Sequence, residues 1–131
     1  MSIFNNHSAE ILILLFFMIT YFMSVLEKLG DWKGTVTYYK NHFKGTLLQK
    51  MIPFLLIKIV VIEITVLILI TIGLYYLVSK DTPVMAKVGL ELSAITLLMF
   101  LFGQRLAKDY PGAMNIAVYF ILNIIGIYLL T

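Results

Sequence analysis

Four stretches of the chain are predominantly apolar, and each is bounded by polar residues, proline or glycine. They cover residues 9–29, 53–79, 84–102 and 111–130. A helix needs about 20 apolar residues to cross the hydrocarbon core of a bilayer. The pattern therefore predicts an all-α membrane protein with four transmembrane helices. Because the connections are short, we expect an up-down bundle that forms a single domain over residues 1–131.

The segment 31–50, between the first two spans, is too polar to cross a membrane and too aromatic for a plain linker. Its aromatic and its basic residues each recur at helical spacing, so they would form two different faces of a helix. The aromatic face holds Trp32, Tyr39 and Phe43, and the basic face holds Lys33, Lys40 and Lys44. We expect an interfacial helix that these residues anchor in the headgroup layer. A loop is the alternative, because Gly34 and Gly45 are poor helix formers.

The composition agrees with membrane insertion, since 61% of the residues are hydrophobic, 13% are charged and the mean hydropathy is +0.97. The chain has no cysteine, which excludes disulfides, thiolate nucleophiles and cysteine-ligated metals. Its net charge of +3 comes mainly from scattered lysines rather than a basic tract. We therefore expect anionic lipid headgroups as partners, and no nucleic acid.

The basic residues are distributed unevenly among the connections. The stretches between the first and second spans and between the third and fourth hold Lys28, Lys33, Lys40, Lys44, Lys50, Arg105 and Lys108. The opposite side holds Lys80 and Lys87. Basic residues near span ends favour the cytoplasmic side. We therefore expect both termini on the non-cytoplasmic side of the membrane.

Two charged residues lie inside the second span, Lys58 and Glu63. A lysine can extend its ammonium group to the interface, but an ionised carboxylate near the bilayer centre costs several kcal/mol unless it is paired or protonated. The first helix offers an acid at the level of Lys58, so we expect a contact between Glu27 and Lys58. Lys28 and Arg105 share this level and extend the network.

Glu63 needs a partner on another helix. Asn115, Asn123 and Glu91 are the candidates, and two carboxylates near the membrane centre could share a proton or line a polar cavity. The alternative is that these groups only fix helix packing. The expected buried polar network consists of Glu27, Lys28, Lys58, Glu63, Glu91 and Arg105.

The sequence carries no recognisable catalytic or nucleotide-binding motif, so we expect no catalytic residue. His7 and His42 lie outside the spans on opposite sides of the membrane. They are predicted to be solvated and cannot ligate one metal together. We therefore expect neither a metal nor an obligatory cofactor.

Three stretches resemble the DoxX family of small four-helix membrane proteins: "SVLEKLGDWKGTVTYYKNHF", "IVVIEITVLILITIGLYY" and "FGQRLAKDYPGAMNIAVYFILNIIGIYLL". The positions that carry over are Glu27, Lys28 and Glu63, with Gln104, Arg105 and Asp109 as features of one bacterial branch. The resemblance implies the bacterial inner membrane and, through the family name, an association with quinone-linked oxidation.

Three functions remain open at this point. The first is a non-catalytic accessory, assembly factor or small subunit of a larger membrane complex, which binds another membrane protein or forms a homo-oligomer. The second is an electron-transfer accessory that binds a quinone between its helices, with Glu63 or Glu91 handling protons. The third is a small proton-coupled transporter, although four helices are few for alternating access.

Overall fold

The computed structural model describes the backbone of residues 2–131 and the side chains of residues 7–131. Residues 2–131 contain no strand. The elements that they form are α1 (Ser2–Gly30), α2 (Trp32–His42), the short 3-10 helix η1 (Gln49–Met51), α3 (Ile52–Lys80), α4 (Val84–Leu106) and α5 (Tyr110–Leu130). The predicted all-α class is therefore confirmed for this part of the chain.

Over the described residues, four helices are long and apolar enough to cross a membrane. They are α1, from His7 onward, α3 together with η1, α4 and α5. This agrees with a multi-pass membrane protein. α4 extends to Leu106, beyond the predicted end of the span at Phe102. The helix does not continue past this residue, and Lys108 has a positive φ of 57°.

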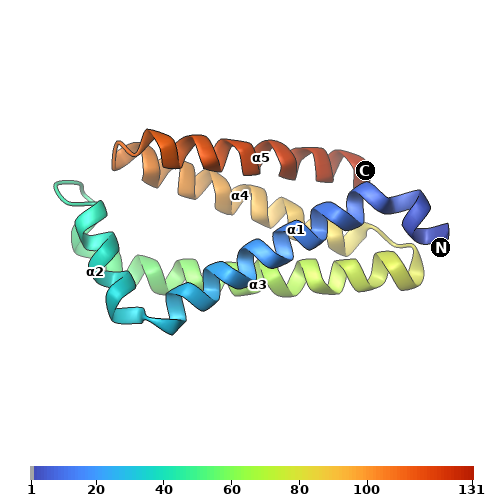
Figure 1. Ribbon diagram of the computed structural model, residues 1–131, viewed down its shortest axis with the longest axis horizontal. Helices are drawn as coiled ribbons and strands as arrows, with labels where there is room; N and C mark the ends of the chain where they lie inside the picture. Colours follow the sequence, from blue (N-terminus) through green and yellow to red (C-terminus); the bar gives the residue numbers. More distant parts are fainter. Residues whose placement is uncertain (1) are drawn as a thin grey trace.

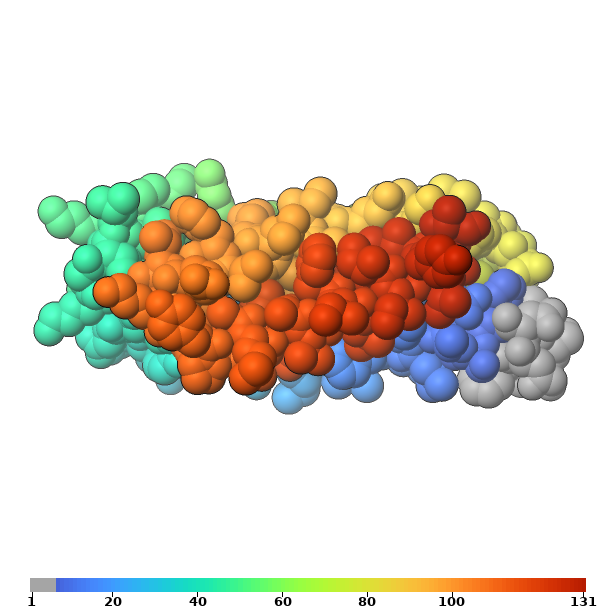
Figure 2. Space-filling view, turned by 90° about the horizontal axis from the view of Figure 1, so that it is seen from above, coloured from blue at the N-terminus to red at the C-terminus, as the bar shows by residue number. Residues whose placement is uncertain are grey.

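Both chain termini and the α3–α4 turn lie at one end of the bundle, and α2 lies across the other end (Figure 1). We refer to these as the terminal end and the α2 end. α3 packs against α1 and α4, α4 also packs against α5, and α1 contacts α5 less extensively. On the face shown in Figure 2, α5 runs along the middle, with α4 at one edge and α1 at the other.

α3 and α4 approach each other closely toward the terminal end because small residues line their contact. A Cβ atom at Gly73 would overlap the backbone of Ala86, and one at Gly89 would lie 3.0 Å from the side chain of Ile70. Toward the α2 end the two helices diverge (Figure 1). Small residues let helix backbones come together in membranes, so these positions determine where α3 and α4 are in close contact.

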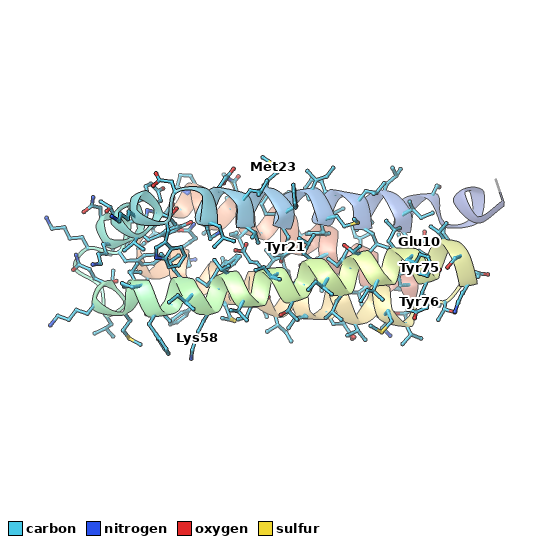
Figure 3. All side chains as sticks on the ribbon, turned by 90° about the horizontal axis from the view of Figure 1, so that it is seen from below. Glu10, Tyr21, Met23, Lys58, Tyr75 and Tyr76 are labelled. Atoms are coloured by element: carbon cyan, nitrogen blue, oxygen red, sulfur yellow. The ribbon has the colours of Figure 1, made fainter. Side chains whose placement is uncertain are left out.

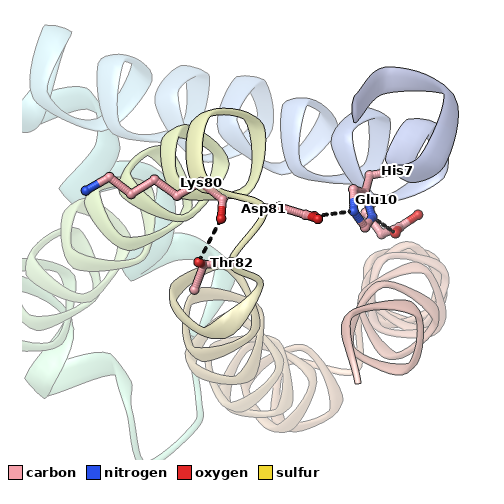
Figure 4. Close-up of polar contacts among 5 residues, drawn as sticks. All are labelled: His7, Glu10, Lys80, Asp81 and Thr82. Carbon is pink, nitrogen blue, oxygen red and sulfur yellow. Dashed lines mark hydrogen bonds and ion pairs between the residues drawn. The ribbon is translucent and has the colours of Figure 1, made fainter. Parts of the chain in front are cut away.

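His7 joins the start of α1 to the α3–α4 turn (Figure 4). Its Nδ1 lies 2.8 Å from Glu10 Oε2, and its Nε2 lies 2.7 Å from Asp81 Oδ1. Asp81 ends α3 in the left-handed region, with a φ of 51°, which aspartate tolerates better than most residues. The His7 side chain is 25% exposed and so still reaches solvent as predicted, but its imidazole also bridges two carboxylates, which the sequence did not indicate.

α2 begins where the Asp31 carboxylate accepts a hydrogen bond from the Gly34 amide at 3.1 Å. The helix is therefore present, although it covers 32–42 rather than the whole segment. Phe43 is buried with Ile52 and Leu56, and Trp32 and Tyr39 pack against this cluster. The aromatic face thus packs over the α2 end of the bundle, and its anchoring in headgroups stays a prediction. Lys33, Lys40 and Lys44 are exposed.

Candidate functional site

Glu63 is the most deeply buried charged side chain among the described residues, with 1% of its surface exposed. Its Oε1 atom lies 3.0 Å from Lys28 Nζ, and its Oε2 atom accepts a hydrogen bond from Ser24 Oγ at 2.6 Å. Lys28 Nζ also donates to Ser24 Oγ at 2.5 Å. The three side chains form a closed polar triangle between α1 and α3, in which the two charges neutralise each other.

The geometry of α1 explains how Lys28 reaches Glu63. Ser24 and Lys28 are one turn apart on the same face, and helical side chains lean toward the N-terminus of their helix. The ammonium group of Lys28 therefore lies near the level of Ser24, deeper in the bundle than its own Cα atom. Removing two charges from water is costly, and close pairing with an added hydrogen bond offsets much of that cost.

A second buried cluster lies next to the first, one turn farther along α1 toward the terminal end. The Tyr21 hydroxyl is 2.7 Å from Ser93 Oγ, which also accepts a hydrogen bond from Asn123 Nδ2 at 2.8 Å. Figure 3 shows Tyr21 pointing from α1 into the bundle. The cluster links α1, α4 and α5 by hydrogen bonds, which fixes the relative rotation of these helices.

A cavity of about 710 Å³ occupies the α2 half of the bundle, where α3 and α4 diverge. All four long helices and α2 contribute to its lining. Tyr21, Ser24, Lys28 and Glu63 give its wall one polar patch, and most of the remaining surface is apolar. Ligand sites usually combine an apolar lining with a few convergent polar groups, and this cavity has that character.

The cavity opens sideways between α3 and α4. Its exposed lining residues all come from these two helices, and they are Lys58, Ile95, Leu98, Met99 and Phe102. The four from α4 are apolar, and Lys58 Nζ lies 4.5 Å from the centre of the Phe54 ring at the edge of the opening. The opening, which we call the portal, faces the surface that a membrane would cover.

α2 closes the cavity at the α2 end of the bundle. Tyr39 and Phe43 line this end, and His42 Nε2 connects α2 to the α4–α5 turn through Gln104 Oε1 (2.9 Å) and Asp109 Oδ2 (3.4 Å). His42 is therefore not the solvated residue that we predicted. Burial raises the pKa of the Tyr39 phenol above its usual range, so this hydroxyl keeps its proton.

The structure brings together only two members of the predicted buried network, Lys28 and Glu63. The others are exposed, and they are Glu27, Lys58, Glu91 and Arg105. The predicted contact between Glu27 and Lys58 is wrong, because no ion pair joins them among the described side chains. Figure 3 shows Lys58 pointing away from the bundle. The Arg105 guanidinium instead lies 5.3 Å from the centre of the Tyr110 ring.

The expected partners of Glu63 also differ from those observed. Asn115 is exposed, and Asn123 belongs to the second cluster. Sequence reasoning did not connect Ser24 to Glu63. It missed Tyr21 altogether, although a tyrosine in the middle of a span, away from both interfaces, is a sign of a buried hydrogen bond.

The polar patch can hold a neutral ligand that carries a hydrogen-bond acceptor. Lys28 Nζ is a donor, and Glu63 Oε1 has no aligned hydrogen bond within the described residues despite its contact with Lys28. Because the pair has no net charge, a charged head group would have to be desolvated there without a counterion. No group of three or more potential metal ligands occurs among residues that the structure describes.

Comparisons of the chain with models of protein families, with curated proteins and with solved structures find no match.

Proposed function

We propose that the protein is a DoxX-like, non-catalytic accessory of a bacterial inner-membrane complex, and that its own task is to hold a quinone in the cavity. The cavity with the Lys28–Glu63 pair in its wall carries this proposal. A quinone dissolves in the bilayer, is neutral, and joins a polar ring to a long apolar tail. These properties match a mostly apolar cavity with one polar patch.

The polar patch suits both redox forms of such a ligand. A quinone carbonyl or a quinol hydroxyl oxygen can accept a hydrogen bond from Lys28 Nζ. The portal between α3 and α4 provides a route from the membrane. The chain holds the ligand and presents it to a partner complex, which carries out the electron transfer.

A fluorescence titration tests the binding. Trp32 is the single tryptophan of the sequence, and it packs against Phe43, Ile52 and Leu56, which line the cavity. We expect a short-chain quinone to quench its fluorescence saturably in reconstituted protein. Replacing both Lys28 by Met and Glu63 by Gln should weaken binding about tenfold, the equivalent of one to two lost hydrogen bonds.

The Lys80→Gln variant is the matched control, because Lys80 is exposed at the terminal end, where its ammonium group lies 5.3 Å from the centre of the Tyr76 ring. It should bind quinone like the unaltered protein. Quenching that rises linearly with quinone in all three proteins would mean that the quinone stays in the lipid, and would refute the binding site.

The accessory role has a separate test. Gentle solubilisation of native membranes, followed by affinity capture of the tagged chain, should recover another membrane protein in a fixed ratio. A stable particle that contains no other protein would contradict the accessory role, while leaving quinone binding to be judged by the titration.

A further inference from the structure

Glu91 is an exposed carboxylate on the membrane-spanning part of α4. It forms no ion pair or side-chain hydrogen bond with the described side chains, residues 7–131. The face of α4 toward α3 holds Ala86 and Gly89, and the face toward α5 holds Leu90 and Ser93. Glu91 points away from both neighbours, to the outside of the bundle.

The depth of Glu91 makes this exposure costly. α4 runs from Val84 to Leu106, so its midpoint is residue 95, and Glu91 lies about 6 Å from it along the axis. The hydrocarbon core extends about 15 Å to either side of the membrane centre. A glutamate side chain is too short to reach the interface from there, and an ionised one in contact with acyl chains costs several kcal/mol.

A base lies on the same side of α4. Lys87 is one turn nearer the terminal end, is half-buried, and has no ion-pair partner among the described residues. Exposed apolar residues flank the two charges, with Val88 at 41% and Ile95 at 56% of their surface exposed. The terminal half of α4 thus carries one acid and one base within an apolar stripe.

We propose that a second copy of this chain covers this stripe, with α4 against α4 around a two-fold axis normal to the membrane. In such an isologous contact, Lys87 of each copy meets Glu91 of the other. The resulting set of two acids and two bases has no net charge and is shielded from lipid. A pair formed within one chain would leave both groups exposed to acyl chains, so it would not remove the cost.

The proposed interface occupies the terminal half of α4, whereas the portal opens in the α2 half. The two surfaces meet at Ile95, which borders the portal. The inference does not depend on what the cavity binds.

Cysteine cross-linking tests the proposal directly, because the chain has no cysteine of its own. Val88→Cys and Ile95→Cys should each form a disulfide-linked dimer when native membranes are oxidised. The matched controls are Ile121→Cys on α5 and Ile68→Cys on α3, whose side chains are 60% and 51% exposed. Equal cross-linking at all four positions, or linkage of Val88→Cys to a different protein, would overturn the proposal.

A charge exchange separates contact between chains from contact within one chain. The Lys87→Glu variant has two acids on the stripe, and the Glu91→Lys variant has two bases. Each variant alone should dimerise about tenfold more weakly, the equivalent of one lost interhelical polar contact. The two variants expressed together with different tags should pair with each other as strongly as the unaltered chains. Unchanged dimerisation of either variant alone, or the absence of mixed pairs, would refute contact between chains.

Discussion

At the scale of single residues, the defining feature is that Lys28 and Glu63 neutralise each other inside the bundle. The ammonium and carboxylate groups are 3.0 Å apart, and the side chains are 12% and 2% exposed. A buried ion pair adds little stability by itself, but removing one partner leaves an uncompensated charge. The pair is therefore a point at which single and double substitutions should have very different effects.

Lys28→Met should lower the free energy of unfolding by about 3 kcal/mol, because Glu63 loses its counterion in a site that water does not reach. Adding Glu63→Gln to this variant should recover most of the loss, since the double variant buries no charge. Lys58→Met is the control and should change stability by less than about 0.5 kcal/mol, because Lys58 is exposed. Chemical unfolding in detergent measures all three values. Equal losses in the single and double variants would show that the two side chains are not coupled.

At the scale of the helices, the arrangement depends on where α3 and α4 touch. Gly73 and Gly89 allow contact toward the terminal end, and beyond them the helices separate and leave the cavity. The positions of the small residues therefore determine both where α3 and α4 are in contact and where the cavity lies. α2 then covers the open end with Tyr39 and Phe43.

Gly73→Ala should lower the free energy of unfolding by about 1 to 3 kcal/mol, because the added Cβ overlaps the backbone of Ala86, which cannot turn away. Gly30→Ala makes the same chemical change at the end of α1, where no atom lies within 4 Å of the added Cβ. That control should leave stability unchanged or raise it slightly, since alanine favours helices. If thermal unfolding showed the two variants to be alike, the close contact between α3 and α4 would be in doubt.

His42→Ala should loosen α2, because it removes the hydrogen bond to Gln104 and the contact with Asp109. A net loss of about 1 kcal/mol corresponds to an approximately fivefold increase in amide hydrogen exchange along α2. Lys40→Ala, on the same helix but exposed, should leave the exchange rates unchanged. Exchange read by mass spectrometry compares the two, and equal protection of α2 in both variants would contradict the proposed tether.

At the scale of the whole molecule, the hydropathy pattern was sufficient to place the four long helices and α2. Span length and the turns around Pro83 and Pro111 are local properties, so they can be read from the sequence. The pairing of charged side chains from different helices is not a local property. The sequence identified Lys28 and Glu63 separately, but it joined Lys58 to Glu27, because the axial register of α1 against α3 is set by packing along both helices.

The partners of the two histidines could not be predicted from the sequence either. Both lie outside the membrane core, as the sequence indicates, yet each contacts a residue far away along the chain. The role of Asp81 and Asp109 as histidine partners follows only from the antiparallel arrangement of the helices. The cavity was likewise inaccessible to sequence reasoning, since it results from the divergence of two helices.

The central claim is that the cavity beside Glu63 holds one membrane-dissolved quinone, and native mass spectrometry of protein released directly from bacterial membranes tests it most directly. The account predicts a mass increment of one prenylquinone for each chain, and the loss of that increment when Lys28→Met and Glu63→Gln are combined. A chain without any bound molecule, or an increment that the double variant retains in full, would contradict it.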